Sequence, residues 1–282
     1  MTYTTTSNVP YGPLASETMD VYLPTSATPT GAIILIHGGA WEVGGKSLFE
    51  TAPGFQHNMA AAFANRGMAV FVINYTLYKP GATNWSDVYG SVETALSFIK
   101  TNEAAYNLNG VIGAIGDSAG AQLASMLGVT GQVAFVGDNS GPVNLTAAGG
   151  LQKIVDGMVG VAGLQAASPI DNIGAGTSPF FITQGLSDHT VAPSQATAFE
   201  AALTADGVSA RLVTYAGGHV FQDTAFKTAM NVLDQEVAWS AAQIARLTQA
   251  VAAFAPASGI SGRFEAGEAV GASGVVLVEA RR

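Results

Sequence analysis

Several short stretches of the chain are apolar at nearly every position, whereas others repeat apolar residues at every third or fourth position. Uninterrupted runs occur at Ala32–His37, Ala69–Tyr75 and Val111–Ile115, and such runs are typical of strands buried on both faces. The stretch Ser86–Tyr106 has the other pattern, with apolar residues at the period of one helix face. Strands and helices are therefore predicted to alternate along the chain.

The same two patterns extend over most of the remaining sequence. Further strands are predicted at Met19–Pro24, Val133–Val136, Pro179–Thr183 and Arg211–Tyr215. Further helices are predicted at Gln56–Arg66, Ala121–Leu127, Ser194–Ala205 and Thr224–Phe254. This alternation is typical of the α/β class, in which helices cover both faces of a mostly parallel sheet.

Two regions depart from the alternation. The segment at about 139–178 is rich in Gly, Ala and Asn, and its place between two predicted strands suits a cap-like insertion over the mouth of a site. Residues 256–282 form a Gly-rich tail that ends on an apolar run, Gly274–Val278. A packed edge strand, an arm exchanged within a homodimer and an export-related tail would each produce this pattern. We expect one large domain over residues 1–255, followed by a tail of unknown role.

The composition of the chain limits the kinds of binding partner that are expected. The chain has 282 residues, 48% apolar and 11% charged, which suffices for one large core. A net charge of -9 without any cluster of Lys or Arg argues against nucleic-acid binding. No apolar run approaches the roughly 18 to 20 residues of a membrane-spanning helix, so membrane insertion is not expected. Met1–Pro10 lacks the pattern of a secretory signal, which leaves the cytoplasm and leaderless export as expected locations.

The sharpest candidate for chemistry is the pentapeptide Gly116–Gly120, with the sequence GDSAG. The pattern Gly-x-Ser-x-Gly alone is nearly at chance level in a chain with 34 glycines. Its position between the predicted strand Val111–Ile115 and the predicted helix Ala121–Leu127 is what gives it weight, because a serine on such a turn is exposed at the edge of the sheet. Ser118 is the predicted nucleophile. The chain has no cysteine, which excludes thiol nucleophiles, disulfides and thiolate metal sites.

A serine hydroxyl needs a base, and the chain has four histidines. His219 is the predicted base, because it lies on a Gly-rich loop directly after the last predicted strand. The other three suit the role less well. His37 begins a loop better suited to presenting backbone N–H groups, His57 lies in a predicted helix, and His189 adjoins a candidate acid.

The third member of such a site is a carboxylate on another strand-end loop, before the histidine in the chain. Asp188 fits, because it follows the predicted strand Pro179–Thr183 and precedes His219. Asp138 is the alternative, since some enzymes of this layout take the acid one strand earlier. Asp117 is assigned to the serine turn and Asp171 to the cap-like segment.

An oxyanion hole requires two or three backbone N–H groups that point at one oxygen atom. One is predicted at Ala119, the residue after the serine. The others are expected from the loop Gly38–Ala40, which directly follows an early predicted strand.

Together these features resemble the hormone-sensitive-lipase-like and the feruloyl or acetyl esterase-like (BD-FAE-like) branches of the α/β-hydrolases. The likeness is carried by four parts of the chain, which are Val9–Gly12 with Asp20–Pro24, His37–Trp41 (HGGAW), Gly116–Ala124 (GDSAGAQLA), and the loops of Asp188 and His219. The resemblance implies an α/β-hydrolase fold with an eight-stranded sheet, a Ser-His-Asp triad, no cofactor, and oxyanion donors at Gly39 and Ala40. Many relatives have a third glycine where this chain has Ala40, which bears on the shape of the acyl pocket.

The resulting expectation is a serine carboxylesterase that acts on small-molecule esters with short-chain acyl or aryl groups and needs no metal. Trp41 and Tyr75 are candidates for the substrate pocket. Three alternatives stay open at this point. HGGAW is also similar to kynurenine formamidases, feruloyl or acetyl xylan esterases share the layout, and a non-catalytic binding protein can keep the fold.

Overall fold

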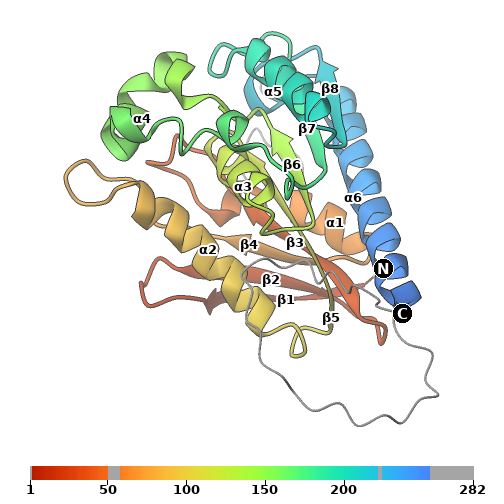
Figure 1. The fold of residues 1–282 in the computed structure, drawn as a ribbon. Helices are drawn as coiled ribbons and strands as arrows, with labels where there is room; N and C mark the ends of the chain where they lie inside the picture. Colours follow the sequence, from red (N-terminus) through yellow and green to blue (C-terminus); the bar gives the residue numbers. More distant parts are fainter. Residues whose placement is uncertain (1, 50–57, 222–223, 255–282) are drawn as a thin grey trace, which may run out of the picture.

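The computed structural model describes residues 2–49, 58–221 and 224–254. Its centre is an eight-stranded sheet in the order β1-β2-β4-β3-β5-β6-β7-β8 (Figure 1). The strands are β1 (Tyr3–Pro10), β2 (Thr18–Pro24), β3 (Thr30–Ile36), β4 (Ala69–Ile73), β5 (Leu108–Asp117), β6 (Phe135–Asn139), β7 (Phe180–Gly185) and β8 (Ala210–Tyr215).

Only β2 runs against the other strands. β1 pairs antiparallel with β2, and β2 pairs antiparallel with β4, whereas every pair from β4 through β8 is parallel. The carboxyl ends of the parallel strands therefore meet at one edge of the sheet. In sheets of this kind that edge is where ligands bind, because the loops after the strands converge there.

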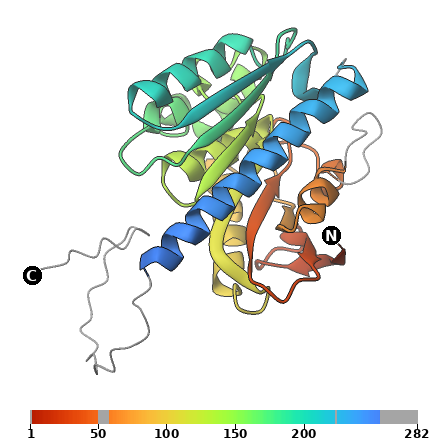
Figure 2. The same cartoon turned by 90° about the vertical axis from the view of Figure 1, so that its right-hand side faces the viewer.

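The helices cover both faces of the sheet. They are α1 (Met59–Asn65), α2 (Trp85–Thr101), α3 (Ala119–Val129), α4 (Gln152–Val159), α5 (Pro193–Ala205) and α6 (Phe226–Phe254). Short 3-10 helices are η1 (Lys46–Phe49), η2 (Leu145–Ala147), η3 (Gly149–Leu151), η4 (Val161–Gly163), η5 (Pro169–Asn172) and η6 (His219–Phe221). Helix α6 runs diagonally across one face, drawn in blue in Figure 2.

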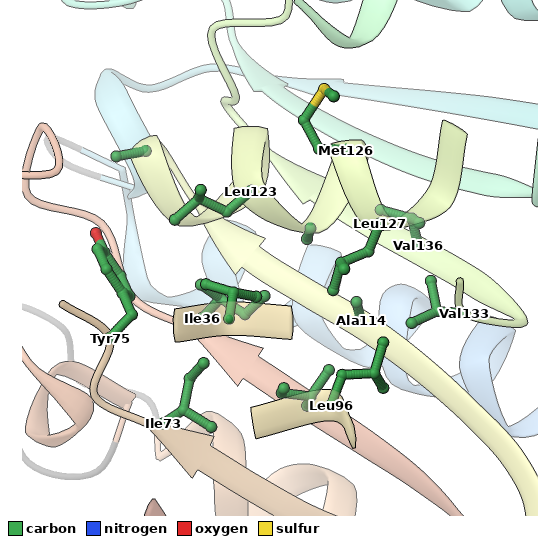
Figure 3. Packing of buried hydrophobic residues seen from close by; sticks show 14 of the residues in the cluster. Ile36, Ile73, Tyr75, Leu96, Ala114, Leu123, Met126, Leu127, Val133 and Val136 are labelled. Carbon is green, nitrogen blue, oxygen red and sulfur yellow. The ribbon is translucent and has the colours of Figure 1, made fainter. Parts of the chain in front are cut away.

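Two hydrophobic clusters follow from the alternation of side chains along each strand. In β3, Ile34 and Ile36 contribute to the cluster under α2, α3 and α5, whereas Ile33 and Leu35 contribute to the cluster under α1 and α6. Both faces of the central strands are thus apolar, which explains their uninterrupted apolar runs. Figure 3 shows the first cluster, where Leu123 of α3 packs over the sheet.

All seven strands predicted from the apolar runs are present, and the α/β class with an eight-stranded, mostly parallel sheet is confirmed. Strand β1 was not predicted, because its residues are mostly polar and exposed and it pairs only at the sheet edge. Helix α2 ends at Thr101 and not at Tyr106, since the Asn102 side chain donates to the Phe98 carbonyl and turns follow.

The long connection from β6 to β7 contains α4 and four of the short 3-10 helices. One side chain holds it against the domain with two hydrogen bonds, since Gln195 of α5 accepts from the Asn144 N–H and donates to the Ala147 carbonyl. Its assignment as a cap stays a prediction. The tail at 256–282 lies outside the described residues. In the part of the chain that the structure describes, no helix is long and apolar enough to cross a membrane.

Leu123 tests how strongly the α3 contact with the sheet stabilises the domain. Its side chain has no exposed surface, so Leu123→Ala removes three buried carbons and leaves a cavity. The expected loss is about 2–5 kcal/mol in the free energy of unfolding, measured by urea denaturation. The matched control is Leu14→Ala at a residue that is 51% exposed, which should change stability by less than about 0.5 kcal/mol. Equal effects of the two substitutions would contradict the packing described.

Candidate active site

Ser118 occupies the turn between β5 and α3, with φ 55° and ψ -118°. A positive φ is strained for a residue with a side chain, and such strain persists only where the surrounding structure enforces it. Two glycines make the turn possible. A Cβ at Gly116 would overlap the carbonyl of Gly120, and a Cβ at Gly120 would overlap the carbonyl of Ile36. The geometry is that of a nucleophile elbow at the carboxyl edge of the sheet.

His219 follows β8 and contacts both other members of the predicted triad. Its Nε2 lies 2.8 Å from Ser118 Oγ, and its Nδ1 lies 2.8 Å from Asp188 Oδ2. A hydrogen bond and a ring contact fix the loop that carries His219. The Phe221 N–H donates to the Tyr215 hydroxyl at 3.0 Å, and the rings of Phe221 and Tyr215 stack. The imidazole is thus placed with one nitrogen toward an acid and the other toward a hydroxyl, as proton transfer from serine requires.

Asp188 lies on the loop after β7 with both carboxylate oxygens in hydrogen bonds. Oδ1 accepts from the backbone N–H groups of Thr190 at 2.8 Å and Val191 at 2.9 Å. Oδ2 accepts from His219 and from the Gln184 side chain at 2.9 Å. Burial alone would raise the pKa of Asp188, but the hydrogen bonds from His219 and from the backbone outweigh it, so the pKa lies below its usual value. The carboxylate is therefore ionised at neutral pH and can stabilise a charged imidazole.

Asp138, the alternative acid, is engaged elsewhere. It accepts from Ser125 Oγ of α3 at 2.6 Å and from the Gly141 N–H at 2.8 Å, without a contact to His219. Asp117 is buried beside the turn and accepts from the Asn139 side chain, and Asp171 is exposed in η5. Of these carboxyl groups, only that of Asp188 hydrogen-bonds to the histidine among the described residues.

Of the other histidines that the structure describes, neither His37 nor His189 hydrogen-bonds to Ser118. His37 is buried, its Nδ1 donates to the Gly38 carbonyl at 2.7 Å, and burial lowers its pKa to about 4. It is neutral at pH 7 and fixes the start of the Gly-rich loop. His189 is exposed, and His57 lies outside the described residues.

The loop after β3 is a tight turn in which several residues have positive φ. Gly39 has φ 115° and Ala40 has φ 50°, and the Gly39 carbonyl accepts from the N–H groups of Glu42 and Val43 at 3.0 Å. Within residues 2–49, 58–221 and 224–254, the N–H groups of Gly39, Ala40 and Ala119 donate to no acceptor. The Ala119 N–H also begins α3, where the helix dipole favours negative charge. The assignment of these three N–H groups as an oxyanion hole stays a prediction.

A cavity of about 360 Å³ opens over Ser118 and His219. Its wall consists of Gly38, Gly39, Ala40, Glu42, Val43, Leu48, Asp117, Ser118, Leu151, Thr190, His219 and Val220. Ala119 lies beneath the turn with no exposed surface.

Neither aromatic candidate for the substrate pocket lines this cavity, which corrects that expectation. Trp41 has no exposed surface, and its Nε1 donates to Gln122 of α3 at 3.1 Å. Tyr75 stacks on the His37 ring with centroids 4.3 Å apart and donates its hydroxyl to the His37 carbonyl. In Figure 3 it lies in the core with Ile73. Both side chains support the loop at 37–41 from inside the domain, because their large apolar rings pack in the core.

Two residues of the site escaped the sequence analysis. Gln184 donates to Asp188, and the Asn139 carbonyl accepts from the Ser118 N–H at 2.8 Å. Each is a polar residue near the end of an otherwise apolar strand, and that position is the signal that could have identified it. Among the described residues, no group of three or more His, Asp or Glu side chains could hold a metal ion.

The fold and this constellation define the class of the protein as an α/β-hydrolase with a hydrogen-bonded Ser-His-Asp arrangement. The BD-FAE family model matches residues 19–203, which is more than half of the chain. The chain belongs to the BD-FAE family.

Two curated relatives show low sequence identity to this chain. Esterase LipQ of Mycobacterium tuberculosis is 28% identical over 241 residues, which cover 75% of this chain and 55% of LipQ. Kynurenine formamidase of Danio rerio is 31% identical over 126 residues, which cover 44% of this chain and 38% of the formamidase. The chain therefore spans about half or less of the length of the curated relatives it matches.

Among solved structures, a truncated carbohydrate esterase from gut microbiota superposes with a TM-score of 0.72. It is 22% identical, and the match covers 85% of this chain and 96% of that one. At this identity the likeness supports the fold, which it shares over nearly the whole described domain.

Gly120 offers a test of the turn geometry. Gly120→Ala forces a Cβ into the backbone of β3, so we expect it to displace Ser118 and to lower the free energy of unfolding by at least about 2 kcal/mol. Gly90→Ala is the matched control, because no atom lies within 4 Å of a Cβ at this position in α2. Alanine there should stabilise the helix by up to about 1 kcal/mol. Thermal and urea denaturation measure both, and a neutral Gly120→Ala would contradict the close approach.

Proposed function

We propose that this protein is a serine carboxylesterase that cleaves small esters through an acyl-enzyme intermediate. The observation that carries the proposal is the chain of two 2.8 Å hydrogen bonds from Asp188 through His219 to Ser118, beneath an open cavity. Membership of the BD-FAE family and the name of the relative LipQ, an esterase, support it.

In the first half of the reaction, Ser118 Oγ attacks the ester carbonyl while His219 Nε2 takes its proton. Asp188 keeps the proton of His219 on Nδ1 and stabilises the charged imidazole. The carbonyl oxygen becomes negative and accepts hydrogen bonds from the N–H groups of Gly39, Ala40 and Ala119. When the tetrahedral intermediate collapses, His219 gives its proton to the leaving alcohol, and the acyl group stays on Ser118.

In the second half, a water molecule enters where the alcohol left. His219 Nε2 takes a proton from this water as its oxygen attacks the acyl carbonyl, and the same N–H groups stabilise the second oxyanion. Collapse of that intermediate returns the proton to Ser118 Oγ and releases the carboxylic acid. The enzyme is regenerated without any cofactor.

The cavity wall favours a particular kind of substrate. Val43, Leu48, Leu151 and Val220 make it largely apolar, and its volume of about 360 Å³ suits a short acyl chain or one aromatic ring. Glu42 and Asp117 are the acidic side chains at this wall, and they disfavour substrates with a negative charge near the ester. Leu151 belongs to the segment at 139–178, and we propose that this segment acts as a cap over the acyl pocket.

Ser118→Ala should abolish ester hydrolysis and leave folding nearly unchanged, because it removes only the nucleophilic oxygen atom and keeps the Cβ in place. Loss of a triad member lowers kcat by a factor on the order of 10⁴ or more. Hydrolysis of p-nitrophenyl acetate and p-nitrophenyl butyrate measures the effect, with circular dichroism as the check on folding. Full activity in the variant would refute the assignment.

A substrate panel distinguishes the related activities. We expect kcat/KM to be highest for p-nitrophenyl acetate or butyrate, lower for methyl ferulate, and lowest for N-formylkynurenine. The opposite order, with N-formylkynurenine first, would assign a formamidase, the activity in the name of the relative from Danio rerio. No turnover of any of the four by folded protein would favour a binding protein that has kept the fold.

A further inference from the structure

Glu236 is a carboxylic acid with no exposed surface, and the proposed reaction does not use it. It lies on α6, on the stripe that faces the sheet together with Leu233, Val237 and Ser240. Its Oε1 lies against Gly137 of β6, where a Cβ would overlap with it. A buried carboxylate without a cation is strongly unfavourable, so an acid in this position is protonated or has a role that offsets its cost.

Asn139, at the end of β6, connects Glu236 to the serine turn. Its Nδ2 donates to Asp117 Oδ1 at 3.1 Å and makes a long hydrogen bond of 3.4 Å to Glu236 Oε2. Its Oδ1 accepts from Thr183 Oγ1 of β7 at 2.7 Å. Its backbone carbonyl accepts from the Ser118 N–H at 2.8 Å. Asn139 is thus bonded to β5, β7, α6 and the serine itself.

The hydrogen bond from the Ser118 N–H matters because the serine has a strained backbone. A positive φ in a residue other than glycine costs about 1–3 kcal/mol and is maintained only by fixed neighbours. The Asn139 carbonyl is one such neighbour, and the side chains around Asn139 determine where that carbonyl lies.

We propose that Glu236 is a positioning residue for Ser118 and acts through Asn139. The inference rests on the proposed function of Ser118 as the nucleophile. In its protonated form Glu236 fills the space over Gly137 and accepts from Asn139 without placing a charge behind the serine. When it ionises, a negative charge is added on the far side of the turn from the oxyanion hole, which destabilises the developing oxyanion.

The groups around Glu236 favour the protonated form at neutral pH. Burial, together with the charge of Asp117, raises the pKa of Glu236 to about 8, and burial raises the pKa of Asp117 to about 7. Asp138 of β6 adds a further negative charge. The guanidinium of Arg211, on β8, donates to the Gln235 side chain at the exposed side of α6. It is therefore directed to Gln235 and not to Glu236. Ionisation of Glu236 therefore falls on the alkaline side of neutrality, where reactivity should decline.

The test compares Glu236→Gln, which keeps the shape and an acceptor but cannot ionise, with Glu236→Leu, which has no acceptor. Ser240→Ala is the matched control, because Ser240 is fully buried one turn further along α6. The readout is the second-order rate constant for phosphorylation by paraoxon, followed as p-nitrophenol release from about pH 6 to about pH 9, with circular dichroism and Tm on each variant.

At pH 7 we expect Glu236→Leu to react at least about tenfold more slowly than the wild type, and Glu236→Gln to retain at least about a third of its rate. We expect the reactivity of the wild type to decline near pH 8, and Glu236→Gln should lose this decline. Ser240→Ala should match the wild type in rate and in pH profile.

Two results separate failure of this inference from failure of the proposed function. A folded wild type that does not react with paraoxon would overturn both. A reactive wild type with a Glu236→Leu variant of equal rate, or with Glu236→Gln and Glu236→Leu equally impaired, would overturn the positioning role alone. If Glu236→Leu does not fold, the pH profile of Glu236→Gln decides, and an unchanged alkaline decline contradicts the proposal.

Discussion

The close approach of β5, α3 and β3 at the serine turn is the constraint on which the rest of the site depends. Ser118 is held at a positive φ, and Gly116 and Gly120 allow backbones to meet where any side chain would collide. The turn places the hydroxyl at the carboxyl edge of the sheet, the only edge where the loops after β3, β7 and β8 can meet it. A small displacement here would break the bonds to His219 and misalign the oxyanion donors together.

The residues of the site lie on loops that follow separate strands of one sheet. Parallel pairing fixes the ends of β3, β5, β7 and β8 relative to one another, so the oxyanion loop, Ser118, Asp188 and His219 need no contact with each other to be brought near. Side chains that pack below these loops also fix the positions of the loops. Tyr75 and Trp41 fix the loop at 37–41, and Asn139 fixes the serine turn. Helix α6, the last described helix, contacts Asn139 through Glu236 and is thereby connected to the serine turn.

The sheet and the three hydrogen-bonded residues could be predicted from the sequence because both leave local signals. Buried strands are continuously apolar, and Ser118, Asp188 and His219 each follow one of them. Prediction from the sequence failed where the determinant is a contact between distant residues. Strand β1 is polar and is a strand only because β2 pairs with it. Trp41 and Tyr75 carry the same local signal whether they face a substrate or the core, and only packing against Gln122 and His37 decides. Asn139 and Glu236 meet across 97 positions, a separation that no local pattern encodes.

The central claim is that Ser118 is a nucleophile activated by His219. Its most direct measurement is the site of covalent labelling by a fluorophosphonate probe, located by mass spectrometry of the digested protein. We predict one adduct per chain, on Ser118, and no labelling once His219 is replaced by alanine in a folded protein. An adduct on another residue, or an unlabelled wild type that is folded, would contradict this claim.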